Sequence, residues 1–144
     1  MKIAKSILAL IIISCGIPAN IYSGEANDIG VPVKFIQGCE ADFNGDGITD
    51  LVFLYERSSG VELVVILSDK REYNSIILYK GHDSNLRLTC QYCTKIQETV
   101  AGQGDRQGKI HTIDGNIIKL SQPESSSSVF HWEDGKFKQI WIGD

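Results

Sequence analysis

The residues whose types and spacing could do chemistry lie in one short stretch of the sequence, DFNGDGITD at positions 42–50. Ca²⁺ prefers about six to eight oxygen ligands, so its site needs several carboxylates on a chain that turns back sharply. Near-alternate positions of the stretch provide such oxygens, and Gly47 permits the sharp turn. The predicted metal ligands are Asp42, Asn44, Asp46, the backbone carbonyl of Ile48, and Asp50. The sequence therefore predicts a calcium site in this loop.

The loop follows the ligand order of an EF-hand through its ninth position and then departs from it. An EF-hand closes its loop with a bidentate glutamate at the twelfth position, where this chain has Phe53. The residues that follow the loop, LVFLYE at 51–56, have the apolar and aromatic composition of a strand. We therefore expect Asp50 to coordinate the ion directly and the loop to lead into a strand.

The stretch DFNGDGITDLVFL resembles the Asp-rich calcium loop of FG-GAP and VCBS-type repeats, which joins two strands of a β-propeller blade. The resemblance covers about a tenth of the chain and implies the same five ligands, with Leu51 and Phe53 starting the next strand. A looser resemblance links the chain to small exported bacterial proteins with a cysteine just before the loop. The chain has one such loop and no internal repeat, so it is too short to close a propeller of at least about four blades.

Asp/Asn/Gly-rich turns also occur in β proteins without a metal, because these residues tolerate tight turns. Three carboxylates within nine residues, however, repel one another unless a cation is present. Calcium binding is therefore the favoured interpretation, with an affinity suited to the high calcium concentration outside cells. We expect the ion to fix the loop geometry without taking part in catalysis.

The N-terminus has the layout of a secretory signal, with a basic start, an apolar run at 7–13 and helix breakers after it. The run is far shorter than the roughly 20 residues that span a bilayer. Two processing routes remain open: removal of a signal at 1–23, or removal of 1–14 with Cys15 as a lipidated N-terminus. Both routes predict an exported protein, either periplasmic or secreted, or held at the outer membrane by the lipid on Cys15.

Export affects the interpretation of the other cysteines, Cys39, Cys90 and Cys93. In an oxidising compartment, one disulfide plus one leftover thiol is the simplest arrangement. We expect a structural bridge between Cys39 and Cys90. The alternative is a redox pair of Cys90 and Cys93, but that chemistry needs a helix N-terminus, and LRLTCQYCTKI is typical of a strand.

Short apolar runs separated by turns make up the rest of the chain. They predict strands at 31–38, 51–56, 61–67, 74–81, 84–90, 109–113, 116–121, 128–132 and 136–142. Turn signals separate several runs, and the pairs Asp114-Gly115 and Asp134-Gly135 indicate hairpins. The sequence predicts a single all-β domain at 31–144, an antiparallel meander of about nine or ten strands. A curled sheet, barrel or sandwich with one propeller-blade-like unit would accommodate them.

The net charge and the scarcity of catalytic patterns argue against nucleic-acid binding and against an enzyme. The net charge of −4 argues against nucleic acid, which calls for a concentrated basic surface. His82, His111 and His131 are isolated and belong to no local catalytic or metal-ligand pattern. We therefore predict a non-enzymatic module that binds an envelope protein or glycan, an inhibitor or immunity-type protein being one form. The alternatives are an envelope hydrolase with a site near the metal and the thiol redox protein.

Overall fold

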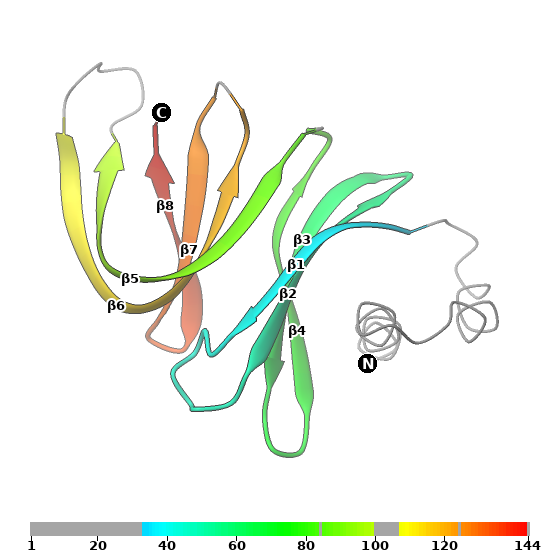
Figure 1. The fold of residues 1–144 in the computed structure, drawn as a ribbon, viewed down its shortest axis with the longest axis horizontal. Coiled ribbons are helices and arrows are strands. Elements are labelled where there is room, and N and C mark those ends of the chain that lie inside the picture. The colour runs from blue at the N-terminus through cyan, green and yellow to red at the C-terminus, as the bar shows by residue number, and fades with distance from the viewer. Residues whose placement is uncertain (1–32, 84, 100–106, 124, 144) are drawn as a thin grey trace.

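The computed structural model of the protein describes residues 33–83, 85–99, 107–123 and 125–143. These residues form eight strands in two four-stranded antiparallel sheets (Figure 1), so the prediction of an all-β fold is confirmed. The predicted signal at 1–23 and the candidate lipidation residue Cys15 lie outside the described residues. Within the described ranges, no helix is long and apolar enough to cross a membrane.

Each sheet is a meander in which strands adjacent in sequence are also adjacent in the sheet. The first sheet consists of β1 (Lys34–Ala41), β2 (Asp50–Arg57), β3 (Gly60–Ser68) and β4 (Tyr73–Gly81). The second sheet consists of β5 (Arg87–Thr99), β6 (Gln107–Ser121), β7 (Ser127–Glu133) and β8 (Lys136–Ile142). The predicted hairpin at Asp134-Gly135 is confirmed between β7 and β8, and both residues have the positive φ that a tight hairpin turn requires.

The prediction of a hairpin at Asp114-Gly115 is wrong, because β6 continues through this pair. β6 pairs with β5 on both sides of it, with Gly115 opposite Cys93 and Thr112 opposite Lys95, and the register shifts between them. The positive φ of Asp114 therefore belongs to a bulge within one bent strand and does not reverse the chain. The two runs predicted at 109–113 and 116–121 merge into β6, which gives eight strands instead of nine or ten.

One apolar core fills the space between the two sheets. Its buried members come from both sheets and include Val52, Leu54, Leu63, Val65, Ile118 and Phe130. A disulfide joins Cys39 in β1 to Cys90 in β5, with 6.3 Å between their Cα atoms, which confirms the expected bridge. Cys93 is the free cysteine of the described residues. Because Cys90 is bonded to Cys39, the Cys90–Cys93 redox pairing is not the one present.

The strands in the middle of each sheet are also buried on their outer faces. Phe53, Val64 and Ile66 form a second apolar cluster on the outside of the first sheet, and Ile117 and Val129 belong to a third on the second sheet. A strand buried on both faces carries continuous apolar runs instead of strict alternation. This explains runs such as LVFLY in β2 and LVVIL in β3.

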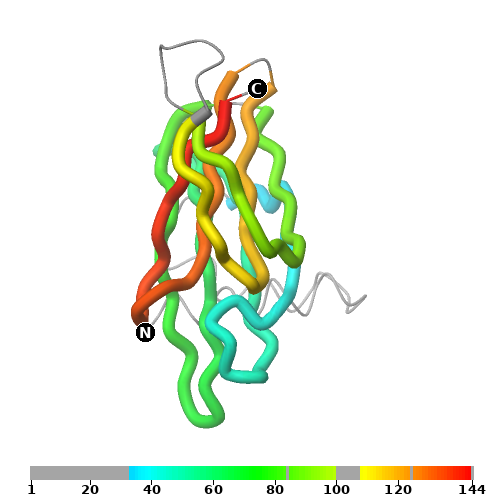
Figure 2. The backbone as a smooth tube through the Cα atoms, turned by 90° about the vertical axis from the view of Figure 1, so that its left-hand side faces the viewer, coloured from blue at the N-terminus to red at the C-terminus, as the bar shows by residue number. Residues whose placement is uncertain are grey.

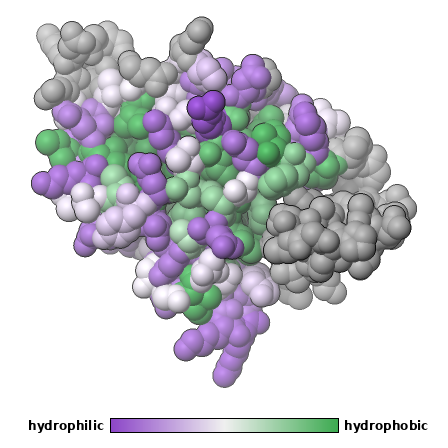
Figure 3. Space-filling model, viewed as in Figure 1, coloured by the Kyte–Doolittle hydropathy of each residue, from purple (hydrophilic) through white to green (hydrophobic). Residues whose placement is uncertain are grey.

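The loop at 42–50 and the turn between β3 and β4 lie at the same end of the molecule. Both occupy the lower end in Figures 1 and 2, and the β3–β4 hairpin extends furthest. The hairpin tip is hydrophilic where it projects at the bottom of Figure 3. The predicted calcium loop is therefore positioned at one end of the sandwich, beside a protruding hairpin.

Candidate metal centre

The loop at 42–50 connects β1 to β2, and its candidate ligands turn inward onto its own backbone. Gly45 and Gly47 have φ values of 77° and 81°, which glycine adopts without the steric cost that other residues incur. The Asp42 carboxylate accepts hydrogen bonds from the N–H groups of Gly45 at 2.7 Å, Asp46 at 3.2 Å and Gly47 at 2.8 Å. Asp42 therefore organises the sharp turn.

Asn44 and Asp46 bond to each other and to the loop backbone. The Asn44 side-chain amide donates to Asp46 Oδ2 at 3.0 Å, and Asn44 Oδ1 accepts from the Asp46 N–H at 3.0 Å. Asp46 Oδ1 accepts from the Ile48 N–H at 2.8 Å. Asp42, Asn44 and Asp46 are thus close together within one loop, as their spacing predicts.

Asp50 begins β2 and is fully buried. Its two carboxylate oxygens accept hydrogen bonds from the Phe43 N–H at 2.9 Å and the Ser68 N–H at 2.8 Å, which fastens the loop to the end of β3. Burial raises the pKa of Asp50, these two hydrogen bonds oppose the rise, and the carboxylates of Asp46 and Asp42 add to it. A carboxylate offers about four lone-pair sites, so each oxygen retains capacity for a further partner.

The ligand types fit a hard cation, but the arrangement is not that of a formed metal cage. Among the described residues, no lysine, arginine or histidine forms an ion pair with Asp42, Asp46 or Asp50. The same residues include no group of three or more His, Cys, Asp or Glu side chains placed to hold a metal ion. Coordination would use the remaining lone pairs of carboxylate oxygens that already accept hydrogen bonds.

The loop is tied to the second sheet by one hydrogen bond. Asn116 in β6 donates its side-chain N–H to the backbone carbonyl of Asp42 at 2.8 Å, although the two residues are 74 positions apart. A hollow of about 280 Å³ lies between the loop and the second sheet. Its walls include Asp42, Asn44, Tyr92, Asp114, Asn116 and Trp132. Tyr92 and Asn116 are not predictable from the sequence as neighbours of the loop, because only the tertiary fold brings them to it.

A second hollow, of about 820 Å³, lies on the other side of the loop against the β3–β4 hairpin. Asn44 and Asp46 line it from the loop, while Arg71 and Tyr73 line it from the hairpin. Asn44 lines both hollows. The loop therefore forms a ridge between two concave surfaces at one end of the molecule.

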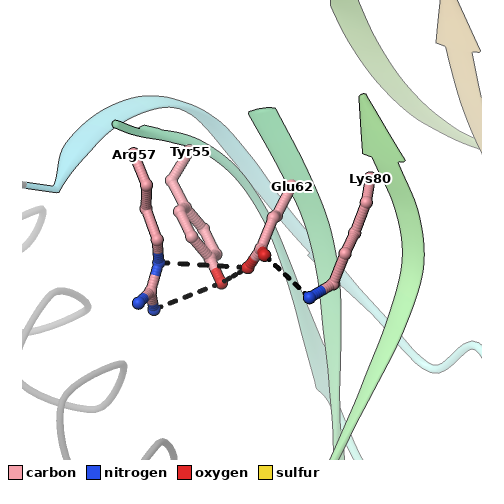
Figure 4. A network of polar contacts seen from close by, with 4 residues as sticks. All are labelled: Tyr55, Arg57, Glu62 and Lys80. Carbon is pink, nitrogen blue, oxygen red and sulfur yellow. Dashed lines mark hydrogen bonds and ion pairs between the residues drawn. The ribbon is translucent and has the colours of Figure 1, made fainter. Parts of the chain in front are cut away.

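A separate polar network lies on the outer face of the first sheet (Figure 4). Glu62 accepts a hydrogen bond from the Tyr55 hydroxyl at 2.5 Å, pairs with Lys80 at 3.0 Å, and lies 3.9 Å from Arg57 Nε. Burial alone would raise the pKa of Glu62, but these partners lower it. Burial and the bond to Glu62 raise the pKa of Tyr55 to about 12. Glu62 is thus held charged and Tyr55 protonated at neutral pH, which suits a structural network.

The histidines do not gather at the loop. His111 Nε2 lies 3.2 Å from Glu98 Oε2 on the β5–β6 hairpin, which makes a histidine–carboxylate pair away from the loop. His131 is buried in β7, and its burial lowers its pKa. These positions bring no histidine to the candidate ligands.

Comparison of the chain with protein-family models, with curated proteins and with solved structures found no match.

Proposed function

We propose that the protein is a non-enzymatic, exported binding module in which Ca²⁺ occupies the 42–50 loop and sets the shape of a ligand site beside it. The donor set supports calcium, because Asp42, Asn44 and Asp46 bring hard oxygen ligands close together within one loop, and Asp50 follows at the start of β2. Bound Ca²⁺ would neutralise the mutual repulsion of Asp42, Asp46 and Asp50, with which no lysine, arginine or histidine of the described residues forms an ion pair.

The contact between Asn116 and the loop carries the proposal. It connects the carbonyl of Asp42, the first candidate ligand, to the wall of the smaller hollow. Tyr92 and Trp132 supply aromatic surface in that hollow, and Asp114 and Asn116 supply hydrogen-bonding groups. Aromatic surface combined with a few polar groups is typical of sites for small ligands and for anchoring side chains. A sugar ring of a glycan, or a side chain of an envelope protein, is the ligand we propose.

Calorimetric titration with Ca²⁺ tests the metal site. We expect one bound ion per chain, with a dissociation constant of about 10⁻⁴ to 10⁻³ M, the range of extracellular modules. Asp42→Asn and Asp46→Asn each remove one negative charge and should abolish binding. The matched control Glu72→Gln removes a charge from the exposed hairpin turn at the same end and should leave binding unchanged. Equal binding by all four proteins would rule out the loop as the site.

Capture of partners from the producing cell's envelope tests the ligand site. We expect capture by the wild type with Ca²⁺ present, less capture with a chelator, and little capture by Trp132→Ala. Trp141→Ala is the matched control, because Trp141 is an exposed tryptophan on β8 outside the hollow residues. If Trp132→Ala captures the same partner as wild type, the hollow is not the site.

A further inference from the structure

The strand β4 forms an open edge of the first sheet. The strand order is β1-β2-β3-β4, and within the described part of the chain β4 pairs with β3 alone. The outward N–H and C=O groups of an edge strand can template pairing with another chain. Natural edge strands are protected by charged side chains, bulges or covering segments, so the distribution of these features along β4 decides where another strand could add.

The protective features of β4 lie in its C-terminal half. The register shift with β3 falls between the pairs Val64↔Ile77 and Leu63↔Tyr79. The charged residue of the strand, Lys80, follows this bulge, and its ammonium group pairs with Glu62 on β3 at 3.0 Å (Figure 4). The charge is therefore directed to the neighbouring strand. The N-terminal half, residues 73–77, carries neither a charge nor a bulge.

This unprotected half exposes two large apolar side chains on one face. Tyr73 is 52% exposed and Ile77 is 44% exposed. Residues two apart in a strand share a face, so Tyr73, Ser75 and Ile77 line the same side. That side is the outer face of the sheet, because Ile77 lies opposite the outer-cluster residue Val64. The two apolar side chains are therefore symmetrically placed about Ser75.

We infer that two copies of the chain associate through β4, in an antiparallel pairing centred on Ser75. In this register Tyr73 lies opposite the partner's Ile77 and Asn74 opposite the partner's Ile76. The two-fold axis repeats each pair, so the dimer contains two aromatic–aliphatic cross-strand pairs. Together these pairs bury Tyr73 and Ile77 of both copies. A shift by one residue would place Tyr73 and the partner's Ile77 on opposite faces. A centre at Ile77 would run the pairing through the bulge.

The surroundings of this strand allow the approach of a second copy. The β3–β4 hairpin projects beyond the rest of the molecule in Figures 1 and 2, which places residues 73–77 near its free end. The hairpin turn, DKRE at 69–72, carries two acids and two bases, so it brings no net charge to the partner's residues 78–81, which it faces in this register. The pairing would join the two first sheets into one continuous sheet. It would also place the partner's β4 beside the larger hollow, which Tyr73 and Ser75 line.

Sedimentation velocity of the protein purified after export tests this pairing. We expect a reversible monomer–dimer equilibrium in wild type. Ile77→Glu and Tyr73→Lys should each raise the dimer dissociation constant at least about tenfold. The two-fold symmetry means that each substitution puts a charge into both of the pairs between Tyr73 and Ile77. Ile110→Glu is the matched control: Ile110 is 60% exposed on β6, and its substitution should leave the dimer intact. Non-reducing electrophoresis separates this dimer from one linked through Cys93.

An equimolar mixture of the two variants tests the register itself. In the mixed dimer the lysine introduced at position 73 of one copy faces the glutamate introduced at position 77 of the other, and the second pair is the native pair of Tyr73 with Ile77. The mixture should therefore dimerise more tightly than either variant alone, which a folding defect could not produce. A wild type that is monomeric at every concentration would overturn the inference. A dimer unaffected by Ile77→Glu would overturn it as well.

Discussion

At the scale of single residues, Asp50 combines two roles that sequence alone does not separate. Its spacing predicts a metal ligand, whereas its burial and its bonds to Phe43 and Ser68 make it a structural clamp. A buried N–H that loses its acceptor incurs the desolvation cost of that group. The carboxylate is therefore important for the loop whether or not a cation is present.

We predict that Asp50→Ala lowers the free energy of unfolding by about 2 to 5 kcal/mol in the presence of a chelator, since two buried N–H groups lose their acceptor. Asp46→Ala is the matched comparison, because Asp46 is exposed and should cost much less under the same conditions. Urea unfolding with excess chelator measures both changes. Equal costs for the two variants would show that Asp50 does not act as a clamp.

At the scale of elements, local patterns predicted most of the strands but not how long they run. Apolar runs marked the strands correctly, and Asp134-Gly135 marked a true hairpin. The pair Asp114-Gly115 was misleading, because the positive φ of Asp114 fits either a turn or a bulge, and pairing with β5 decides between them. One bridge with one leftover thiol was predictable from the cysteine count, and the strand-like stretch LRLTCQYCTKI favoured pairing Cys90 with Cys39. The hollow beside the loop was not, since Asn116 reaches Asp42 only after the sheets pack.

We predict that removal of the bridge between β1 and β5, by Cys39→Ser with Cys90→Ser, lowers the free energy of unfolding by about 2 to 5 kcal/mol. The bridge closes a separation of 51 residues, which restricts the unfolded chain. Cys93→Ser is the control and should change stability little, because its thiol makes one hydrogen bond to the Lys95 carbonyl. Thermal melting of the oxidised proteins checks both results; a loss confined to Cys93→Ser would contradict the structural role of the bridge.

At the scale of the whole molecule, the two sheets share one core and should unfold together. Side chains such as Leu63 from β3 and Ile118 from β6 meet in that core, and the disulfide adds a covalent link. Both tryptophans, Trp132 in β7 and Trp141 in β8, belong to the second sheet. Tryptophan fluorescence therefore reports on the second sheet while a substitution perturbs the first.

We predict that Leu63→Ala, in the first sheet, lowers the free energy of unfolding measured by tryptophan fluorescence by about 2 to 5 kcal/mol. This is the cost of truncating a fully buried leucine side chain. The far-UV circular dichroism transition should move by the same amount, because cooperative unfolding gives coincident transitions by different probes. Ile110→Ala is the control at an exposed apolar position. A fluorescence transition left in place would mean that the sheets unfold separately.

The meander order of the strands has a consequence for how the protein folds. Every strand pair joins neighbours in sequence, so each hairpin can form from local contacts, which are the fast ones in folding. Contacts between the sheets, such as Asn116 with Asp42, close loops of many residues and should form later. We therefore expect the hollow between the 42–50 loop and the second sheet to form in the last step of folding. Only a fully folded chain can then bind a ligand at this end.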